Sequence, residues 1–204
     1  SLLSGPAAII VAAGQGLRAG QPVPKQFASL NGVPVLRRAI DALRQGGIGR
    51  IVVAIPAGAE AIAAECCAGR DMIEFVIGGA TRQQSVRNAL EALAYHAPSE
   101  VLIHDAARPY CPPEVIARLL TALRVHPAAI PVLPVVDSLA YAEADVMGAP
   151  AQRDGLRLLV PWSLYVLVAS LSLLPGPASI APYPPGSRLR EDRKSTRLNS
   201  SHVR

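Results

Sequence analysis

The 204-residue sequence has few aromatic residues, with one Trp, two Phe and five Tyr. Proteins that bind single-stranded nucleic acids depend on stacking of bases on aromatic side chains, so this scarcity disfavours that class. The formal charge of +5 is also unevenly placed, since residues 188–204 hold six Lys or Arg against two Asp or Glu. The rest of the chain is nearly neutral and lacks the basic footprint of DNA or RNA binding. We therefore expect no nucleic-acid partner.

Cysteine is scarce, and its three copies have no C-x-x-C spacing. Cys66 and Cys67 are sequence neighbours, which suits buried reduced thiols better than a disulfide framework. The N-terminus has no basic segment followed by a long apolar run, so no signal peptide is expected. Residues 158–174 are uncharged and just long enough for a membrane span, but Pro161 lies near their start. We expect a cytoplasmic protein that is not associated with a membrane.

Half of the residues are hydrophobic, enough for a sizeable core in one domain. Short, nearly continuous apolar runs, typical of strands covered on both faces, occur at residues 7–13, 50–55, 74–77, 101–104 and 129–133. Segments with helical periodicity alternate with them at residues 35–43, 59–67, 81–93 and 113–123. This alternation predicts an α/β fold with a doubly wound, mainly parallel, Rossmann-like sheet. Ligands bind such sheets at the carboxyl ends of the strands.

The loop after the first strand, residues 14–25 (GQGLRAGQPVPK), combines glycines with Arg18 and Lys25. Glycines let the backbone N–H groups approach phosphates closely, and the two cations add positive charge for a triphosphate. The spacing also satisfies the dinucleotide fingerprint G-x-G-x-x-A, but Pro22 and Pro24 extend a loop where that fingerprint opens into a helix. No G-K-[ST] sequence follows, which excludes a P-loop; a plain Gly/Pro connection remains the other alternative.

Five segments, taken together, indicate a family. They are residues 12–18 (AAGQGLR), 24–26 (PKQ), 78–86 (GGATRQQSV), 104–109 (HDAARP) and 134–138 (PVVDS). In this order and spacing they resemble the 2-C-methyl-D-erythritol 4-phosphate cytidylyltransferases.

The resemblance extends over about residues 7–156 and implies the reaction of CTP with 2-C-methyl-D-erythritol 4-phosphate. The products are the CDP-linked alcohol and pyrophosphate, in non-mevalonate isoprenoid synthesis. The resemblance implies that Arg18 and Lys25 stabilise the negative charge of the transition state. It also implies that nucleotide-binding groups lie at Ala12, Ala13, Gly14, Gly16, Gly79, Ala80 and Ser85. Ser85 has an alternative role as a hydroxyl in the first turn of a helix.

Asp105 follows the fourth strand, where the family holds Mg²⁺ against the triphosphate with a matching carboxylate. A helix cap or turn role is the alternative for Asp105. His104 is expected to pack at the strand end rather than to bind a ligand. Arg108 suits either phosphate binding or anchoring of the loop.

The resemblance also implies that residues 135–156 form an arm that reaches across a homodimer, beyond a nucleotide-binding domain at residues 1–134. Ser138 stands where the family usually has threonine, and it keeps the hydroxyl group that would contact the acceptor. Arg153, within residues 152–156 (QRDGL), matches an arginine that positions the acceptor phosphate in the neighbouring subunit.

After Leu156 the sequence departs from the family. The expected tryptophan, Thr-Pro-Gln segment, helix, last strand and phosphate-positioning lysine do not follow. A shift of reading frame near codon 157 explains the change, and the end of the chain resembles translated sequencing-adapter read-through. We therefore set residues 157–204 aside as a segment without native structure, and we expect weak or no activity from this chain.

Three alternatives stay open at this point. In a variant of this reading, the chain is the front half of a bifunctional enzyme whose second half is a zinc-dependent cyclase. A cytidylyltransferase for another polyol phosphate, such as ribitol 5-phosphate, would share the CTP-binding half. A nucleotide-binding fragment without catalysis is the third alternative, although Arg18, Lys25 and Asp105 favour a catalytic ancestor.

Overall fold

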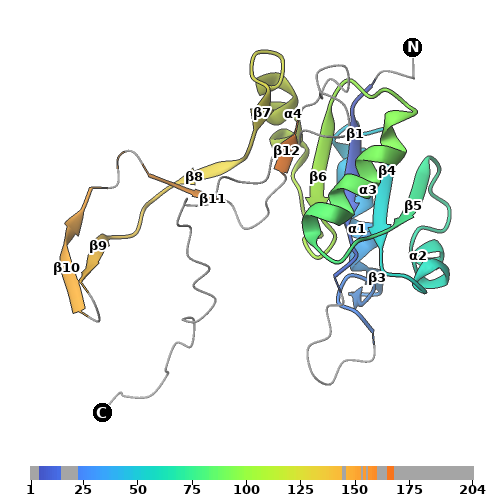
Figure 1. Ribbon diagram of the computed structural model, residues 1–204, viewed down its shortest axis with the longest axis horizontal. Coiled ribbons are helices and arrows are strands. Elements are labelled where there is room, and N and C mark those ends of the chain that lie inside the picture. The colour runs from blue at the N-terminus through green and yellow to red at the C-terminus, as the bar shows by residue number, and fades with distance from the viewer. Residues whose placement is uncertain are drawn as a thin grey trace. The chain divides into compact units, whose positions relative to one another are not determined.

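The computed structural model describes residues 5–14, 23–143, 146–152, 154, 156–159 and 165–167. Six strands form the main sheet (Figure 1): β1 Ala7–Val11, β4 Arg50–Ile55, β5 Ile73–Ile77, β6 Val101–Asp105, β7 Ala128–Ala129 and β12 Tyr165–Leu167. Their order is β5-β4-β1-β6-β12-β7, and the pairs β5/β4, β4/β1 and β1/β6 are parallel. The short β12 runs antiparallel to both β6 and β7. The predicted α/β fold with a mainly parallel sheet is therefore confirmed.

Four α-helices occur in the described part of the chain: α1 Val35–Gln45, α2 Glu60–Cys66, α3 Arg82–Ala94 and α4 Pro113–Ala122. Each begins and ends within three residues of its predicted bounds. Local signals explain two of the starts. Thr81 caps α3 by accepting a hydrogen bond from the backbone of Gln84, and Pro113 occupies the first turn of α4, where no intrahelical N–H partner is needed.

The helices cover both faces of the sheet. On β1, Ile10 packs in a core cluster with α1, α2 and α4, whereas its neighbour Ile9 packs in a second cluster with α3. Successive side chains of a strand point to opposite faces, so the residues of one apolar run pack alternately into the two core clusters. This is why the strands contain almost no polar residues. The buried exception is His104 on β6.

The connections reverse direction at β1. The chain runs outward from β1 to β4 and β5 with α1 and α2 between the strands, and α3 then returns it to β6 on the other side of β1 (Figure 1). Loops that leave a parallel sheet on opposite sides of such a switch point open a crevice at the carboxyl ends of the strands. The topology therefore places the loops after β1, β5 and β6 at one edge.

One predicted strand is wrong. Residues 129–133 were expected to form a single strand, but the structure has β7 at Ala128–Ala129 and β8 at Val132–Pro134. β8 leaves the main sheet and pairs with β11, Arg157–Leu159. Pro131 separates the two pieces, and its missing N–H cannot donate to a strand ladder.

Two hairpins complete the described elements. β2 Ser29–Leu30 and β3 Val33–Pro34 are joined by Asn31-Gly32 with φ of 50° and 76°, the conformation that favours Asn-Gly in tight hairpins. β9 Leu139–Glu143 and β10 Val146–Ala151 pair with each other within the predicted arm. The role of this arm in a dimer stays a prediction.

The segment from residue 157 onward is described at six residues only, those of β11 and β12. The basic residues at 188–204 lie outside the described residues, and so does most of the uncharged stretch at 158–174. The predicted domain boundaries therefore stay predictions. Across the described ranges, no helix is long and apolar enough to span a lipid bilayer.

Candidate functional site

Backbone hydrogen bonds bring three loops to the carboxyl edge of the sheet. The N–H of Gly78, after β5, donates to the carbonyl of Ile55 on β4 at 2.8 Å. The N–H of Ala106, after β6, donates to the carbonyl of Val11 on β1 at 3.0 Å. The loop after β1 begins beside them at Ala12, which is buried. Three of the five segments that carried the family resemblance thus meet at one edge.

Two of these loops approach each other closely at Gly78. A Cβ atom placed on Gly78 would lie 2.2 Å from the Cβ of Ala13 and 2.9 Å from the Oγ of Ser85. Real Cβ atoms do not approach each other so closely, so only glycine fits here without movement of a loop. The loop after β1 is therefore packed directly on the start of α3.

The first turn of α3 is held by side chains. The Oγ1 of Thr81 accepts from the N–H of Gln84, and the Oε1 of Gln84 accepts from the N–H of Ala80, both at 3.1 Å. The Oγ of Ser85 accepts from the N–H of Gly79 at 3.1 Å and donates to the carbonyl of Thr81 at 3.0 Å. Ser85 is buried and has the first-turn role that was its alternative, with one lone pair left over. Its contact with cytosine stays a prediction.

Gln26 ties the Lys25 segment to the loop after β1. Its side-chain Nε2 donates to the carbonyl of Ala12 at 2.8 Å and to the carbonyl of Gly14 at 2.7 Å. The carbonyl of Gln26 accepts from the N–H of Leu36, which begins the buried face of α1. Lys25 itself is exposed. The exposed Lys25 is therefore the neighbour of a residue whose side chain is bonded to the start of the loop after β1.

Asp105, the predicted metal ligand, ends β6 and carries two arginine contacts. Its Oδ1 lies 3.0 Å from Nη2 and 3.2 Å from Nε of Arg82, the first residue of α3. Its Oδ2 lies 3.5 Å from Nε of Arg108. The structure thus supports an anchoring role for Arg108. It also adds Arg82, a residue of the segment at 78–86 for which the sequence predicted no role.

His104 is fully buried, as expected for a packed residue at a strand end. Its Nε2 lies 2.8 Å from the carbonyl of Arg108, which can only accept, so Nε2 carries the proton. Burial lowers the pKa of His104, and the imidazole is therefore neutral at pH 7. Its Nδ1 has no hydrogen-bond partner within the described part of the chain.

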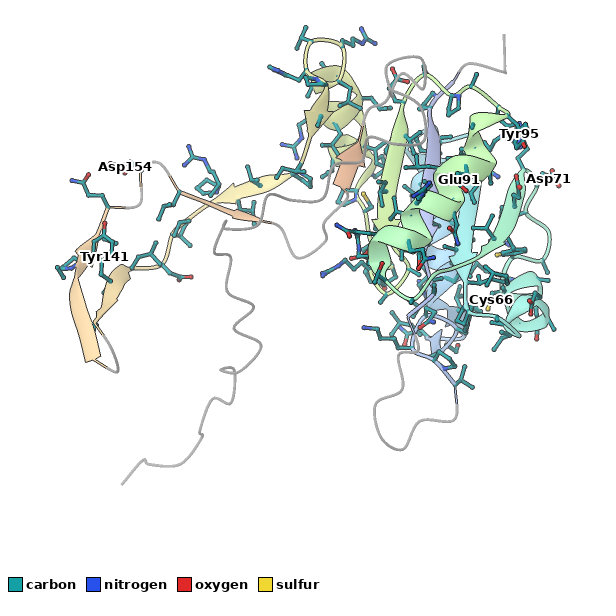
Figure 2. The ribbon with its side chains drawn as sticks, viewed as in Figure 1. Cys66, Asp71, Glu91, Tyr95, Tyr141 and Asp154 are labelled. Atoms are coloured by element: carbon teal, nitrogen blue, oxygen red, sulfur yellow. The ribbon has the colours of Figure 1, made fainter. Side chains whose placement is uncertain are left out.

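The three cysteines are free and buried, and Cys66 lies in α2 (Figure 2). Burial raises the pKa of Cys67 and of Cys111 to about 11. Such thiols stay protonated and unreactive at neutral pH, which agrees with the structural role expected for them.

The structure brings together most of the predicted nucleotide-site residues that it describes. Ala12, Ala13 and Gly14 follow β1, Gly79 and Ala80 precede α3, Ser85 lies in its first turn, and Asp105 ends β6. Ser138 directly precedes β9, and among the described strands the β9–β10 hairpin forms a two-stranded sheet of its own. Gly16, Arg18 and Arg153 lie outside the described residues.

Comparison with known proteins gives the family. The family model described as 2-C-methyl-D-erythritol 4-phosphate cytidylyltransferase matches residues 7–163. The chain belongs to this family. Its fold is shared with solved members of the family. One of them, the cytidylyltransferase of Thermus thermophilus, is 34% identical with a TM-score of 0.59, and the match covers 78% of this chain and 69% of that one.

Curated members of the cytidylyltransferase family are closer in sequence. The bifunctional enzyme IspD/IspF of Novosphingobium aromaticivorans is 55% identical over 150 residues, which cover 74% of this chain and 39% of that protein. The 2-C-methyl-D-erythritol 4-phosphate cytidylyltransferase of Cereibacter sphaeroides is 47% identical over 153 residues, which cover 74% of this chain and 68% of that protein. The chain thus spans about two fifths of the length of the bifunctional relatives that it matches.

Proposed function

We propose that this chain binds CTP at the carboxyl edge of its sheet. We further propose that its family reaction transfers the cytidylyl group to 2-C-methyl-D-erythritol 4-phosphate. The observation that supports this most is the packing of Ala13 against Gly78 at the switch point of the sheet, where Asp105 is in register with Val11 of β1. Small residues on two touching loops leave backbone groups available to a base and to phosphates.

In the proposed reaction an oxygen of the acceptor phosphate attacks the α-phosphorus of CTP. A new P–O bond forms, the bond to the β-phosphate breaks, and pyrophosphate leaves with the electron pair. Negative charge accumulates on the phosphoryl oxygens in the transition state, so fixed cations are the main requirement. Lys25, held by the bonds of Gln26 to the loop after β1, and Arg18 from the same loop are proposed to supply them.

A divalent cation fits the donor groups at this edge. Mg²⁺ is usually held by one or two carboxylates together with substrate phosphates and water. Asp105 supplies one carboxylate there, and among the described residues no group of three or more His, Cys, Asp or Glu forms a metal cage. When bound, Mg²⁺ would neutralise phosphate charge. We propose Asp105 as its protein ligand.

We propose that the arm supplies the part of the active site that binds the acceptor. Arg153 and Ser138 would contact the acceptor phosphate and alcohol in the site of a second subunit, so the active form is proposed to be a homodimer. The paired strands β9 and β10 give this arm a hairpin structure of its own. A cytoplasmic location stays a prediction.

Isothermal titration of the purified chain with CTP tests the nucleotide half. We expect saturable binding with a dissociation constant in the range of about 10 µM to 1 mM. Release of pyrophosphate should then depend on 2-C-methyl-D-erythritol 4-phosphate and should not be supported by ribitol 5-phosphate. An absence of CTP binding at millimolar concentration would refute the proposal.

Turnover by this chain is expected to be weak, because the Thr-Pro-Gln segment and the later lysine expected from the resemblance do not follow the arm. A chimera that joins residues 1–156 to the C-terminal segment of the Cereibacter sphaeroides relative provides the comparison. We expect the chimera to release pyrophosphate at least about tenfold faster, since the acceptor site is then complete. Equal rates for the two proteins would show that residues 157–204 do not limit the reaction.

The substitution Gly78→Ala should weaken CTP binding as well as stability. The added methyl group must displace Ala13 or Ser85, at a cost of about 1–3 kcal/mol in the free energy of unfolding. Urea denaturation and CTP titration measure the two effects.

Two glycines provide controls for Gly78→Ala. At Gly46 a Cβ would lie 2.3 Å from the Cδ1 of Ile116, so Gly46→Ala should destabilise the core and leave the CTP affinity of the folded protein unchanged. Gly49→Ala meets no atom within 4 Å and should change neither quantity. If Gly78→Ala and Gly46→Ala affected CTP binding equally, the proposed packing of the loops around the nucleotide would be wrong.

A further inference from the structure

Both carboxylate oxygens of Asp105 face guanidinium groups. Arg82 approaches Oδ1 with two nitrogens, at 3.0 and 3.2 Å, and Arg108 approaches Oδ2 at 3.5 Å. The three residues come from two elements that meet at the carboxyl edge, the end of β6 with its loop and the start of α3. The Asp105 side chain is only 27% exposed, so solvent screens these contacts partially.

This arrangement opposes metal binding by the same carboxylate. A Mg²⁺ or Mn²⁺ ion needs a carboxylate oxygen at about 2.1 Å, which would place a divalent charge close to the Arg82 guanidinium. Like charges repel at such a distance, and the oxygen that faces Arg82 already accepts two hydrogen bonds. Asp105 therefore becomes a good metal ligand only when Arg82 has another anionic partner.

A nucleoside triphosphate is such a partner. Arginine forms paired hydrogen bonds with phosphate oxygens as readily as with a carboxylate, and a triphosphate carries several negative charges. Arg82 is the first residue of α3, and a helix N-terminus also favours phosphate groups. The same side chain can thus exchange Asp105 for phosphate with a small movement.

We propose that Arg82 is a charge-exchange residue that couples nucleotide binding to metal binding. In the nucleotide-free protein it holds Asp105 and excludes the divalent cation from that carboxylate. When the triphosphate binds, Arg82 contacts phosphate oxygens and Asp105 becomes available to the cation. The inference rests on the proposed function, since it assumes a triphosphate and a divalent cation at this edge. Arg82 then binds the phosphates directly and positions the cation through its release of Asp105.

Two binding measurements on the full chain separate this role from a general defect. Mn²⁺ binding to the nucleotide-free protein is followed by electron paramagnetic resonance, and CTP binding in EDTA is followed by calorimetry. We expect Arg82→Gln to tighten Mn²⁺ binding about five- to tenfold and to weaken metal-free CTP binding by a similar factor. The two effects have opposite signs, whereas a damaged fold would weaken both affinities. Arg82→Lys keeps the charge and loses the paired hydrogen bonds, so both of its affinities should lie between those of the wild-type chain and those of Arg82→Gln.

Arg87→Gln is the matched control on the same helix. Arg87 pairs with Glu91, labelled on α3 in Figure 2, at 2.9 Å on an exposed surface. Its substitution should leave both affinities unchanged. The double variant Arg82→Gln with Asp105→Asn should lose the Mn²⁺ binding that Arg82→Gln gained.

The outcomes distinguish the inference from the proposed function. If the wild-type chain binds CTP but Arg82→Gln leaves Mn²⁺ affinity unchanged or weaker, the charge exchange is refuted and the proposed function stands. If the gain in Mn²⁺ affinity survives Asp105→Asn, the cation binds elsewhere and the inference is refuted. If CTP binds neither with Mg²⁺ nor in EDTA, the proposed function fails, and the inference fails with it.

Discussion

Gln26→Glu is expected to destabilise the chain by about 3–5 kcal/mol at pH 7, although it changes a single side-chain atom. The Nε2 of Gln26 donates to the carbonyls of Ala12 and Gly14, and Gln26 is only 3% exposed. A glutamate would place a buried carboxylate against these two carbonyl oxygens. The ionised carboxylate has no proton to donate, so both carbonyls would lose the hydrogen bond that Gln26 gives them. Urea or thermal denaturation measures the loss.

The loss should depend on pH in a defined direction. Burial and the two facing carbonyls disfavour the charged glutamate, so its pKa in the folded state is raised above the unfolded value of about 4.3. The folded state then binds more protons than the unfolded state, and the penalty shrinks as the pH falls through the folded pKa. Gln83→Glu is the control, because Gln83 is exposed in the first turn of α3 and should shift stability by less than about 0.5 kcal/mol. A small, pH-independent loss in Gln26→Glu would contradict the anchoring role.

Lys25→Ala should lower the rate of pyrophosphate release about 10²- to 10³-fold. The proposed reason is that the Lys25 ammonium group, held beside the loop after β1, stabilises charge that develops only in the transition state. CTP affinity should fall much less than the rate. Single-turnover assays on the chimera that carries residues 1–156 give both quantities, because its acceptor site is complete.

Arg38→Ala provides the comparison for Lys25→Ala. Arg38 is a half-buried cation of α1 that donates to the carbonyl of Leu30 at 2.7 Å, in the β2–β3 hairpin rather than at the carboxyl edge. Its removal tests whether the loss of any positive charge of this domain lowers the rate of pyrophosphate release. We expect that rate to change by less than about twofold. Equal losses in the two variants would mean that Lys25 contributes only to the general field.

Much of the site could be located from the sequence because the relevant signals are local. Continuous apolar runs such as residues 50–55 predicted the strands, and glycines with cations after the first run predicted a phosphate loop. The parallel topology then places every such loop at one edge. The error at residues 129–133 has a local cause too: Pro131 interrupts the ladder, but an apolar run does not tell which of two sheets each half will join.

The contacts between side chains at the site could not be predicted in this way. Gln26 and Ala12 are 14 residues apart, and Arg82 and Asp105 are 23 apart. Whether a polar side chain meets a carbonyl, a carboxylate or water depends on where α1 and α3 pack on the sheet. Position 78 is another contact that the sequence could not predict. It requires glycine because Ala13, on another loop, occupies the space that a Cβ atom would need.

The sequence by itself determined the α/β class and the approximate positions of the four helices and the four parallel strands, and it predicted the edge at which a nucleotide would bind. These follow from hydrophobic periodicity and chain connectivity, which are properties of neighbouring residues. Only the tertiary structure decided that Gln26 anchors the loop after β1, that a side chain at Gly78 would clash with Ala13, and that Arg82 holds the proposed metal ligand. Each of these depends on distances of a few ångströms between segments far apart in the chain, and such distances are set by packing of the whole core.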